Sequence, residues 1–229
     1  MDTFLYNDAN IEYKEEDYFN LLRMDRDDDF APEALRIFEE GRKIAKPKAL
    51  YGIAYVKDRG EDWVLVEDIC FNSKMLSLNL REAHRVFPYV ATCGKELDEW
   101  AQSFKDYLER YWADKFCEMA VKRVYELTFK DFGKRLNLGK TAVMNPGSLP
   151  DWPISEQKKL FTLLGDKIKA LGVELTDSFL MVPVKSISGI IFPTETEYEN
   201  CMFCPRENCP NRRADYDPNA FEKRFNIMM

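Results

Sequence analysis

Hydrophobic and polar positions recur with a helical period in the first third of the chain. The segment 31–44 places apolar side chains at Leu35, Phe38 and Ile44, on one side of a helical wheel. Pro32 lies near its start, where a missing backbone N–H costs no hydrogen bond. The pattern therefore predicts a helix over 31–44.

The middle of the chain has the same period over a longer stretch. Apolar residues three or four positions apart, with charges between them, predict amphipathic helices over 97–108 and 111–127. A further helix is predicted over 155–164, with Ser155 placed to cap its first turn. A short helix is predicted over 79–85.

Runs rich in β-branched and aromatic residues predict strands between these helices. The loop that begins Asn145-Pro-Gly-Ser-Leu-Pro-Asp-Trp-Pro contains three prolines and a glycine, which exclude a helix. Because strands and helices mix without a βαβ rhythm, the predicted fold class is α+β, with a mixed or antiparallel sheet packed against long helices. The predicted strands are 49–56, 63–71, 86–92, 179–184 and 186–192, the first two joined as a hairpin.

Three segments of different composition divide the chain. Residues 1–30 are rich in acidic and aromatic side chains and are predicted to form an N-terminal arm. Residues 31–200 carry the periodic patterns and are predicted to form the core. Residues 201–229 form a C-terminal segment that begins with clustered cysteines.

Composition narrows the classes of function. The chain has 229 residues, of which 45% are hydrophobic, enough to bury a core without covalent cross-links. Its 33 Lys and Arg against 40 Asp and Glu give a net charge of −7, which argues against a nucleic-acid-binding protein. The first residues lack the basic and apolar regions of a secretion signal, and no run approaches the roughly 18 apolar residues of a membrane span. A cytoplasmic protein is expected.

The strongest local chemical signal is a cysteine cluster at the start of the C-terminal segment. Cys201, Cys204 and Cys209 form a C-x2-C-x4-C array. Two thiolates with two residues between them in a turn can bind one metal, and a third thiolate completes one face of the site. Zinc sites usually close with a second C-x2-C pair, which is absent, whereas iron–sulfur clusters accept mixed spacings. An iron–sulfur cluster is therefore favoured over zinc, and three reduced thiols without a metal are the alternative.

The fourth ligand of such a site is open. Cys93 and Cys117 are candidates, as is a ligand from outside the chain. Cys93 follows Thr92 at the predicted start of a helix, where the helix N-terminus is expected to lower the pKa of the thiol. The alternative for Cys93 is a small, partly buried side chain. Cys70 and Cys117 are expected to pack as small hydrophobic residues.

Three stretches together resemble a known family. They are Ala113-Asp-Lys-Phe-Cys-Glu-Met-Ala, the proline loop after Asn145, and Leu175-Thr-Asp-Ser-Phe-Leu-Met-Val-Pro with a following Ser-Gly. In order and spacing they are similar to motifs of the activation domain of cobalamin-dependent methionine synthase, over roughly residues 85–200. The chain would be a stand-alone version of that domain, to which the cysteine cluster is an addition.

The resemblance implies a function and a set of contacts. Activation domains of that family bind S-adenosylmethionine and present it to oxidised cob(II)alamin, where reduction coupled to methyl transfer restores methylcobalamin. The resemblance thus implies reactivation of a corrinoid methyltransferase, with cobalamin supplied by a partner protein and an electron by a low-potential donor. Its candidate cofactor-binding residues are Glu118, Pro146, Gly147 and Tyr198.

Two positions depart from the family pattern. Val143 stands where the family has an arginine that resembles an anchor for a carboxylate, and Ser148 stands where it usually has a tyrosine. S-adenosylmethionine is therefore expected to bind between the proline loop and the strands over 179–192, but more weakly than in the family. Glu118 falls nearly opposite the apolar stripe of its helix, so a solvated charge is the alternative for it.

Two other functions are compatible with the sequence. One is an iron–sulfur electron-transfer protein that shares only the fold, and the other is a binding module stabilised by zinc. His84 is the single histidine and lacks an Asp-x-His-x-x-Gly context for ligating cobalt. Any corrinoid is therefore expected on a separate protein.

Overall fold

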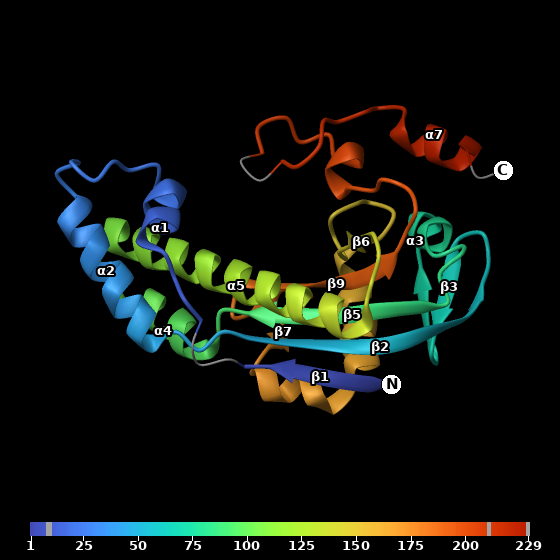
Figure 1. Cartoon of the computed structure of the whole chain (residues 1–229), viewed down its shortest axis with the longest axis horizontal. Coiled ribbons are helices and arrows are strands. Elements are labelled where there is room, and N and C mark those ends of the chain that lie inside the picture. Colours follow the sequence, from blue (N-terminus) through green and yellow to red (C-terminus); the bar gives the residue numbers. More distant parts are fainter. Residues whose placement is uncertain (8–10, 210–211, 228–229) are drawn as a thin grey trace.

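One antiparallel sheet forms the centre of the molecule (Figure 1). The computed structural model describes residues 1–7, 11–209 and 212–227. Across these residues the sheet has seven strands in the order β4-β3-β2-β5-β9-β6, with β1 also paired to β2. Every pairing within it is antiparallel, which confirms the predicted α+β class. The strands are β1 (Asp2–Tyr6), β2 (Lys48–Arg59), β3 (Trp63–Val66), β4 (Ile69–Asn72), β5 (Arg85–Thr92), β6 (Thr141–Met144) and β9 (Ser186–Pro193).

Helices and a small second ribbon surround this sheet. A two-stranded ribbon joins β7 (Glu174–Leu175) to β8 (Met181–Val182). The α-helices are α1 (Glu15–Leu22), α2 (Ala31–Ile44), α3 (Lys74–Asn79), α4 (Lys95–Ser103), α5 (Tyr107–Leu136), α6 (Gln157–Leu164) and α7 (Ala220–Ile227). Short 3-10 helices are η1 (Ile154–Glu156), η2 (Gly165–Leu171) and η3 (Asn200–Phe203). No described helix is both long and apolar enough to cross a bilayer.

The sheet buries both faces because successive side chains of a strand point to opposite sides. Tyr51 and Tyr89 belong to a core cluster with Phe132 of α5 on one face. Their neighbours Leu50 and Val90 belong to a separate cluster with residues of η2. The sheet therefore lies between α5 and the α6–η2 segment.

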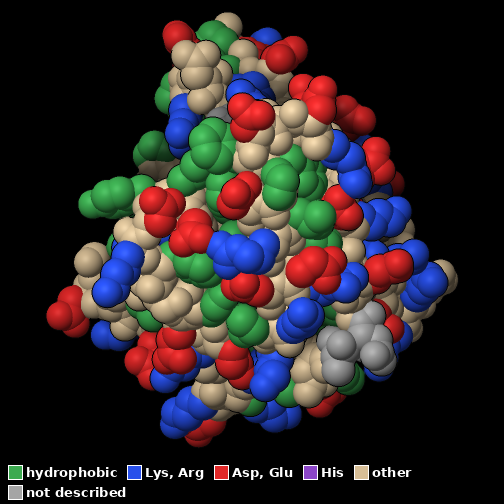
Figure 2. All heavy atoms as spheres, turned by 90° about the vertical axis from the view of Figure 1, so that its left-hand side faces the viewer, with side chains coloured by type: hydrophobic (Ala, Val, Ile, Leu, Met, Phe, Trp, Pro, Cys, Tyr) green, Lys and Arg blue, Asp and Glu red, His purple; other side chains and the backbone are tan. Residues whose placement is uncertain are grey.

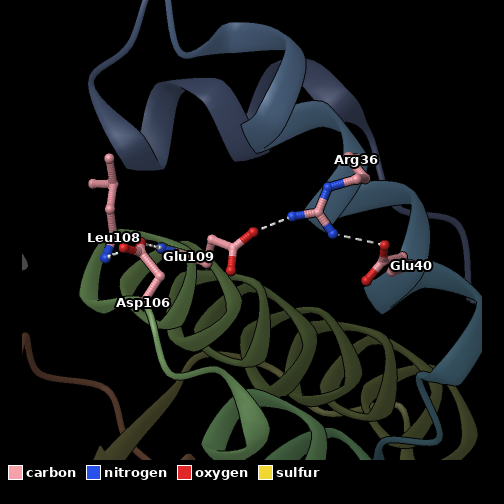
Figure 3. Close-up of polar contacts among 5 residues, drawn as sticks. All are labelled: Arg36, Glu40, Asp106, Leu108 and Glu109. Carbon is pink, nitrogen blue, oxygen red and sulfur yellow. Dashed lines mark hydrogen bonds and ion pairs between the residues drawn. The ribbon is translucent and has the colours of Figure 1, made fainter.

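The long helix α5 begins at a well-defined cap (Figure 3). The Asp106 carboxylate accepts hydrogen bonds from the backbone N–H groups of Leu108 and Glu109, at 2.9 and 3.0 Å. Arg36 of α2 binds the carboxylates of both Glu109 and Glu40 and so links α2 to the first turn of α5. These contacts orient the helix that covers one face of the sheet.

Helices α1, α2 and α5 share a cluster of aromatic side chains. Tyr18, Phe38 and Phe116 lie with ring centroids 5.4 to 6.1 Å apart. A Cβ at Gly41 would lie 2.7 Å from the Phe116 ring, so glycine permits α2 to approach α5 this closely. The cluster lies in the helical end of the molecule, whose surface mixes acidic and basic side chains (Figure 2).

Most predicted elements are present, with shifted ends. The segment 31–44 is helix α2, as predicted. The run 63–71 is two strands, β3 and β4, because the chain turns at Glu67 with a φ of +49°. The helix predicted over 79–85 lies earlier, as α3, where the Ser73 hydroxyl caps the N–H of Leu76. Ser155 is not the predicted cap, because it lies inside η1 and makes no capping hydrogen bond.

The two terminal segments pack against the core. Within residues 1–30, β1 pairs with β2 and the side chains of α1 join the helical core cluster. Within residues 201–229, the Phe203 ring stacks on Tyr198, and the Arg224 guanidinium binds Asn79 Oδ1 at 2.8 Å. The predicted boundaries at 30 and 200 stay predictions.

Candidate functional site: a groove beside the proline loop

A groove of about 470 Å³ lies between the loop that follows β6 and the chain that runs from β8 into β9. The described residues that line it come from β5, α5, β6, the proline loop, α6, the β8–β9 segment and the C-terminal segment. They are Tyr89, Tyr125, Val143, Asn145, Pro146, Ser148, Ile154, Gln157, Leu180, Met181, Val184, Ser186, Ile187, Ser188 and Arg213.

The shape of the proline loop depends on one glycine. Gly147 has a φ of +82°, which L side chains rarely adopt, and its N–H donates to the Trp152 carbonyl at 2.7 Å. A Cβ at this position would lie 2.9 Å from Cδ1 of Ile154. Trp152 is fully buried and anchors the far side of the loop. Gly147 therefore shapes the groove wall, while its neighbour Pro146 lines the groove.

Asn145 holds the floor of the groove together. Its Nδ2 donates to the Tyr89 hydroxyl at 2.9 Å and to the Ser188 carbonyl at 2.8 Å. Its Oδ1 accepts from Nδ2 of Asn200 at 3.0 Å, and Asn200 Oδ1 accepts from the Tyr198 hydroxyl at 2.9 Å. A continuous set of hydrogen bonds thus links β5 and β9 to the loop after β6 and to the start of η3.

A second polar link connects α6 to the strands. The Gln157 side chain donates through Nε2 to the Phe179 carbonyl at 3.1 Å and accepts from the Ser188 hydroxyl at 3.0 Å. Gln157 and Ser188 are both buried. Buried polar groups that are paired in this way keep one arrangement, so these side chains give the groove a defined wall.

The walls of the groove are electrically neutral apart from one cation. Burial raises the pKa of Tyr89 and of Tyr125, whose rings lie 5.2 Å apart, so both hydroxyls stay protonated at neutral pH. Among the lining residues that the structure describes, Arg213 is the one that carries a charge. The groove is therefore suited to a small ligand with both apolar and polar parts, not to a highly charged one.

The residues predicted from the sequence take different places around the groove. Pro146 lines it and Gly147 shapes its wall, whereas Tyr198 is buried and reaches Asn145 only through Asn200. Glu118 does not line it. Its carboxylate pairs with Lys115 at 2.9 Å, is 26% exposed, and faces a different hollow beside α1.

Cys93 does not have the environment that its sequence context predicts. It is fully buried in the helical core, and a hydrogen bond with the Cys117 side chain, together with burial, raises the pKa of its thiol. The expected lowering by the helix N-terminus is therefore wrong, because desolvation and the neighbouring thiol outweigh it. Helix α4, which Cys93 precedes, lies at the lower left of Figure 1, far from the C-terminal segment at the upper right. Cys93 is not placed to complete a site there.

The structure does not support a metal centre at the clustered cysteines. Cys201, Cys204 and Cys209 are half-buried free thiols. Within residues 1–7, 11–209 and 212–227, no group of three His, Cys, Asp or Glu side chains is placed to hold a metal ion. Cys117 is buried as predicted, but Cys70 is exposed because it lies on the outward side of β4.

Sequence reasoning missed several residues of the groove. Tyr125 lies seven residues after Glu118, on the same face of α5, so a helical wheel contained a signal for it. Asn145 stands inside the predicted loop and was available as a polar candidate. Arg213 gave no local signal, because only the path of the C-terminal segment brings it to the groove.

A larger hollow, of about 610 Å³, lies elsewhere on the surface. It is lined by the segment after α3, by the end of β9 with the chain after it, and by Arg224. It contains none of the four residues that the family resemblance implies. The groove beside Pro146 is therefore the better candidate site.

A known protein family matches this region of the chain. Residues 143–212 match the family described as vitamin B12 dependent methionine synthase, activation domain. That span contains the second half of β6, the proline loop, β8 and β9, and it ends one residue before Arg213. The resemblance to the activation domain is confirmed.

A solved structure has the same fold. "Crystal Structure of the MetH Reactivation Domain bound to AdoHcy" superposes with a TM-score of 0.65 and 16% sequence identity, over 87% of this chain and 81% of that chain. At this identity the likeness shows that the chain has the fold of the reactivation domain. Comparison with curated proteins gives no match.

Proposed function

We propose that this activation-domain-like chain binds S-adenosylmethionine in the groove and supports the reductive methylation of a corrinoid held by a partner protein. The observation that carries the proposal is the coincidence of the groove with the family match. The matched residues 143–212 supply most of the groove's lining, including Val143, Asn145, Pro146 and the β8–β9 segment.

The residues present fit such a ligand. A volume of about 470 Å³ lies within the usual range of roughly 300–1,000 Å³ for small-molecule sites. Pro146, Ile154 and Ile187 offer apolar surface for a purine ring. The faces of Tyr89 and Tyr125 offer the kind of aromatic surface that attracts an organic cation such as a sulfonium.

The chain's own contribution is binding and orientation. When bound, S-adenosylmethionine supplies a methyl cation, and the reaction as a whole takes up one electron from an external donor and leaves S-adenosylhomocysteine. No proton is transferred, so the site needs no general acid or base. The groove agrees with this, because its tyrosines are held neutral and its amides are engaged in hydrogen bonds.

The mouth of the groove offers a surface for the partner. Leu180 is 60% exposed and Val184 is 68% exposed, and both line the groove. Val182 between them is also exposed. Apolar side chains gathered at an open site are typical of surfaces that dock another protein. A corrinoid protein that covers this mouth would exclude water while the methyl group is transferred.

The central test uses the protein with a cob(II)alamin-loaded corrinoid protein from the same cell and a competent reductant. Cobalt absorbance is followed with S-adenosylmethionine, with S-adenosylhomocysteine and with neither. Conversion to the methylcob(III)alamin spectrum in the first mixture alone supports the proposal. An unchanged spectrum in all three removes reactivation as the function.

Docking is tested separately by Leu180→Ser, with Tyr107→Ser as the matched control. Tyr107 is also exposed but lies at the first residue of α5, outside the groove lining. We expect Leu180→Ser to weaken the affinity for the corrinoid protein and Tyr107→Ser to leave it unchanged, in analytical ultracentrifugation. Equal affinities for both variants would place the docking surface elsewhere.

A further inference from the structure

We propose that Arg213 of the C-terminal segment replaces the arginine that the chain lacks at position 143, and binds the carboxylate of S-adenosylmethionine. This inference rests on the proposed function. It assigns a specificity role to a residue outside the strands and loop that carry the family motifs.

The position of Arg213 supports this role. Val143 of β6 and Arg213 line the same groove, although they are 70 positions apart. The cation that one element lacks is therefore supplied to the same groove by another. Arg213 is also close enough to Tyr89 and Tyr125 to oppose the rise in the pKa of both hydroxyls.

The backbone beside Arg213 is held in place by the preceding residue. The Arg212 guanidinium donates to the carbonyl oxygens of Cys201, Cys204 and Ala214, each at 3.1 Å. A planar guanidinium with five donors can cross-link a loop in this way. The segment that begins at η3 is therefore folded around Arg212, and Arg213 follows from an anchored position.

Arg213 has hydrogen-bond donors that its contact with Glu199 does not use. Its Nη2 lies 3.1 Å from Oε2 of Glu199, and its side chain is 57% exposed. Contact with Glu199 through one nitrogen leaves other N–H groups of the guanidinium for a second carboxylate. Glu199 thus holds Arg213 near the groove without occupying the whole fork.

The ligand brings a negatively charged group that needs a partner in the groove. S-adenosylmethionine carries one carboxylate, and a carboxylate placed against neutral walls needs a charge-assisted partner. Within the described lining, Arg213 is the group that can provide it. The cysteine-rich segment then has a part in ligand binding that needs no metal.

The experiment measures binding by isothermal titration calorimetry, with S-adenosylmethionine and with its decarboxylated analogue. The proteins are wild type, Arg213→Ala, Arg206→Ala as control, and the double variant Val143→Arg with Arg213→Ala. Arg206 is in the same segment but does not line the groove. We expect Arg213→Ala to lose about tenfold or more in affinity for S-adenosylmethionine, Arg206→Ala to keep it, and the double variant to regain part of the loss.

The ligand pair makes the result specific to the carboxylate. Wild type should bind the decarboxylated analogue about tenfold more weakly than S-adenosylmethionine, and Arg213→Ala should bind the two alike. Equal affinity of wild type and Arg213→Ala for S-adenosylmethionine would overturn the inference and leave the proposed function standing. No binding to wild type at millimolar ligand would overturn both. Because the ligand comparison needs only wild type and one surface variant, it does not depend on whether the double variant folds.

Discussion

Arg213 Nη2 lies 3.1 Å from Glu199 Oε2, at the groove that Val143 of β6 also lines. The pair joins two residues of the segment that follows β9, both partly exposed to solvent. In the absence of a ligand carboxylate, Glu199 is the acid that holds this guanidinium. When ligand binds, its carboxylate shares the guanidinium with Glu199, and the two like charges repel each other.

Glu199→Gln should therefore strengthen S-adenosylmethionine binding. Removing the competing charge frees the guanidinium, and an exposed ion pair of this kind corresponds to about a two- to fivefold change in affinity. Titration calorimetry at low and high salt measures it, and the gain should shrink as salt screens the charges. Weaker binding would show that Glu199 positions Arg213 more than it competes for it.

The hydrogen bonds through Asn145 should stabilise the fold as well as the site. Asn145→Ala removes the donor to Tyr89 and Ser188 and leaves Asn200 without its acceptor. We expect a loss of about 1–3 kcal/mol in the free energy of unfolding, because buried polar groups are left unpaired. Urea titration measures the loss.

Tyr198→Phe tests how far this network extends. It removes only the hydroxyl that donates to Asn200 and should cost about 1 kcal/mol. In a double-mutant cycle with Asn145→Ala, the two losses should sum to more than the loss in the double variant, because they act on one network. Strict additivity would show that the two side chains are independent.

Gly147→Ala should disturb the proline loop through two causes that a control can separate. The alanine Cβ meets Ile154 at 2.9 Å, and the φ of +82° strains any L residue. Gly172 has a φ of +68° with open space around its Cβ position, so Gly172→Ala carries the strain alone. We expect each variant to lose about 1 kcal/mol of stability from strain, and Gly147→Ala alone to lose ligand affinity as well. Unchanged ligand affinity in Gly147→Ala would separate the loop from the site.

Cys204→Ser should leave the protein intact if the clustered thiols hold no metal. The described donors do not gather into a metal site, so we expect less than one equivalent of iron or zinc in anaerobically purified protein, and the same unfolding midpoint for variant and wild type. Elemental analysis and urea titration measure both. A stoichiometric metal in wild type that Cys204→Ser loses would reinstate the iron–sulfur or zinc interpretation.

Buried tyrosines should make the protein less stable in alkali. Burial raises the pKa of Tyr18 in the fold above its unfolded value of about 10, so its contribution is complete below pH 10. Above that pH the unfolded chain releases the proton and the folded chain keeps it, so stability falls. Tyr18→Phe should reduce the slope of unfolding free energy against pH by up to about 1.4 kcal/mol per pH unit in this range. An unchanged slope would mean that Tyr18 ionises equally in both states.

Hydrophobic periodicity along the chain was enough to predict the elements that bury one face. Helix α2 spans the predicted residues because its apolar side chains repeat with the helical period over its whole length. The class of fold, the proline loop and the family resemblance followed from local composition and spacing. The ends of α3 and the division of β3 from β4 did not, because a serine cap and a single positive φ decide them.

Which polar residues come into contact depends on how the distant segments pack together. The family resemblance implied that Pro146 and Tyr198 both contact the ligand, and the fold places Pro146 in the groove lining and Tyr198 behind Asn145 and Asn200. The helix start predicted a lowered pKa for the Cys93 thiol, yet the packing of α5 buries it beside Cys117 and raises that pKa. Arg213 reaches the groove only because the segment after β9 folds back past Asn145. Local sequence encodes which face of an element is apolar, whereas the groups that come together across the sheet depend on the path of the whole chain.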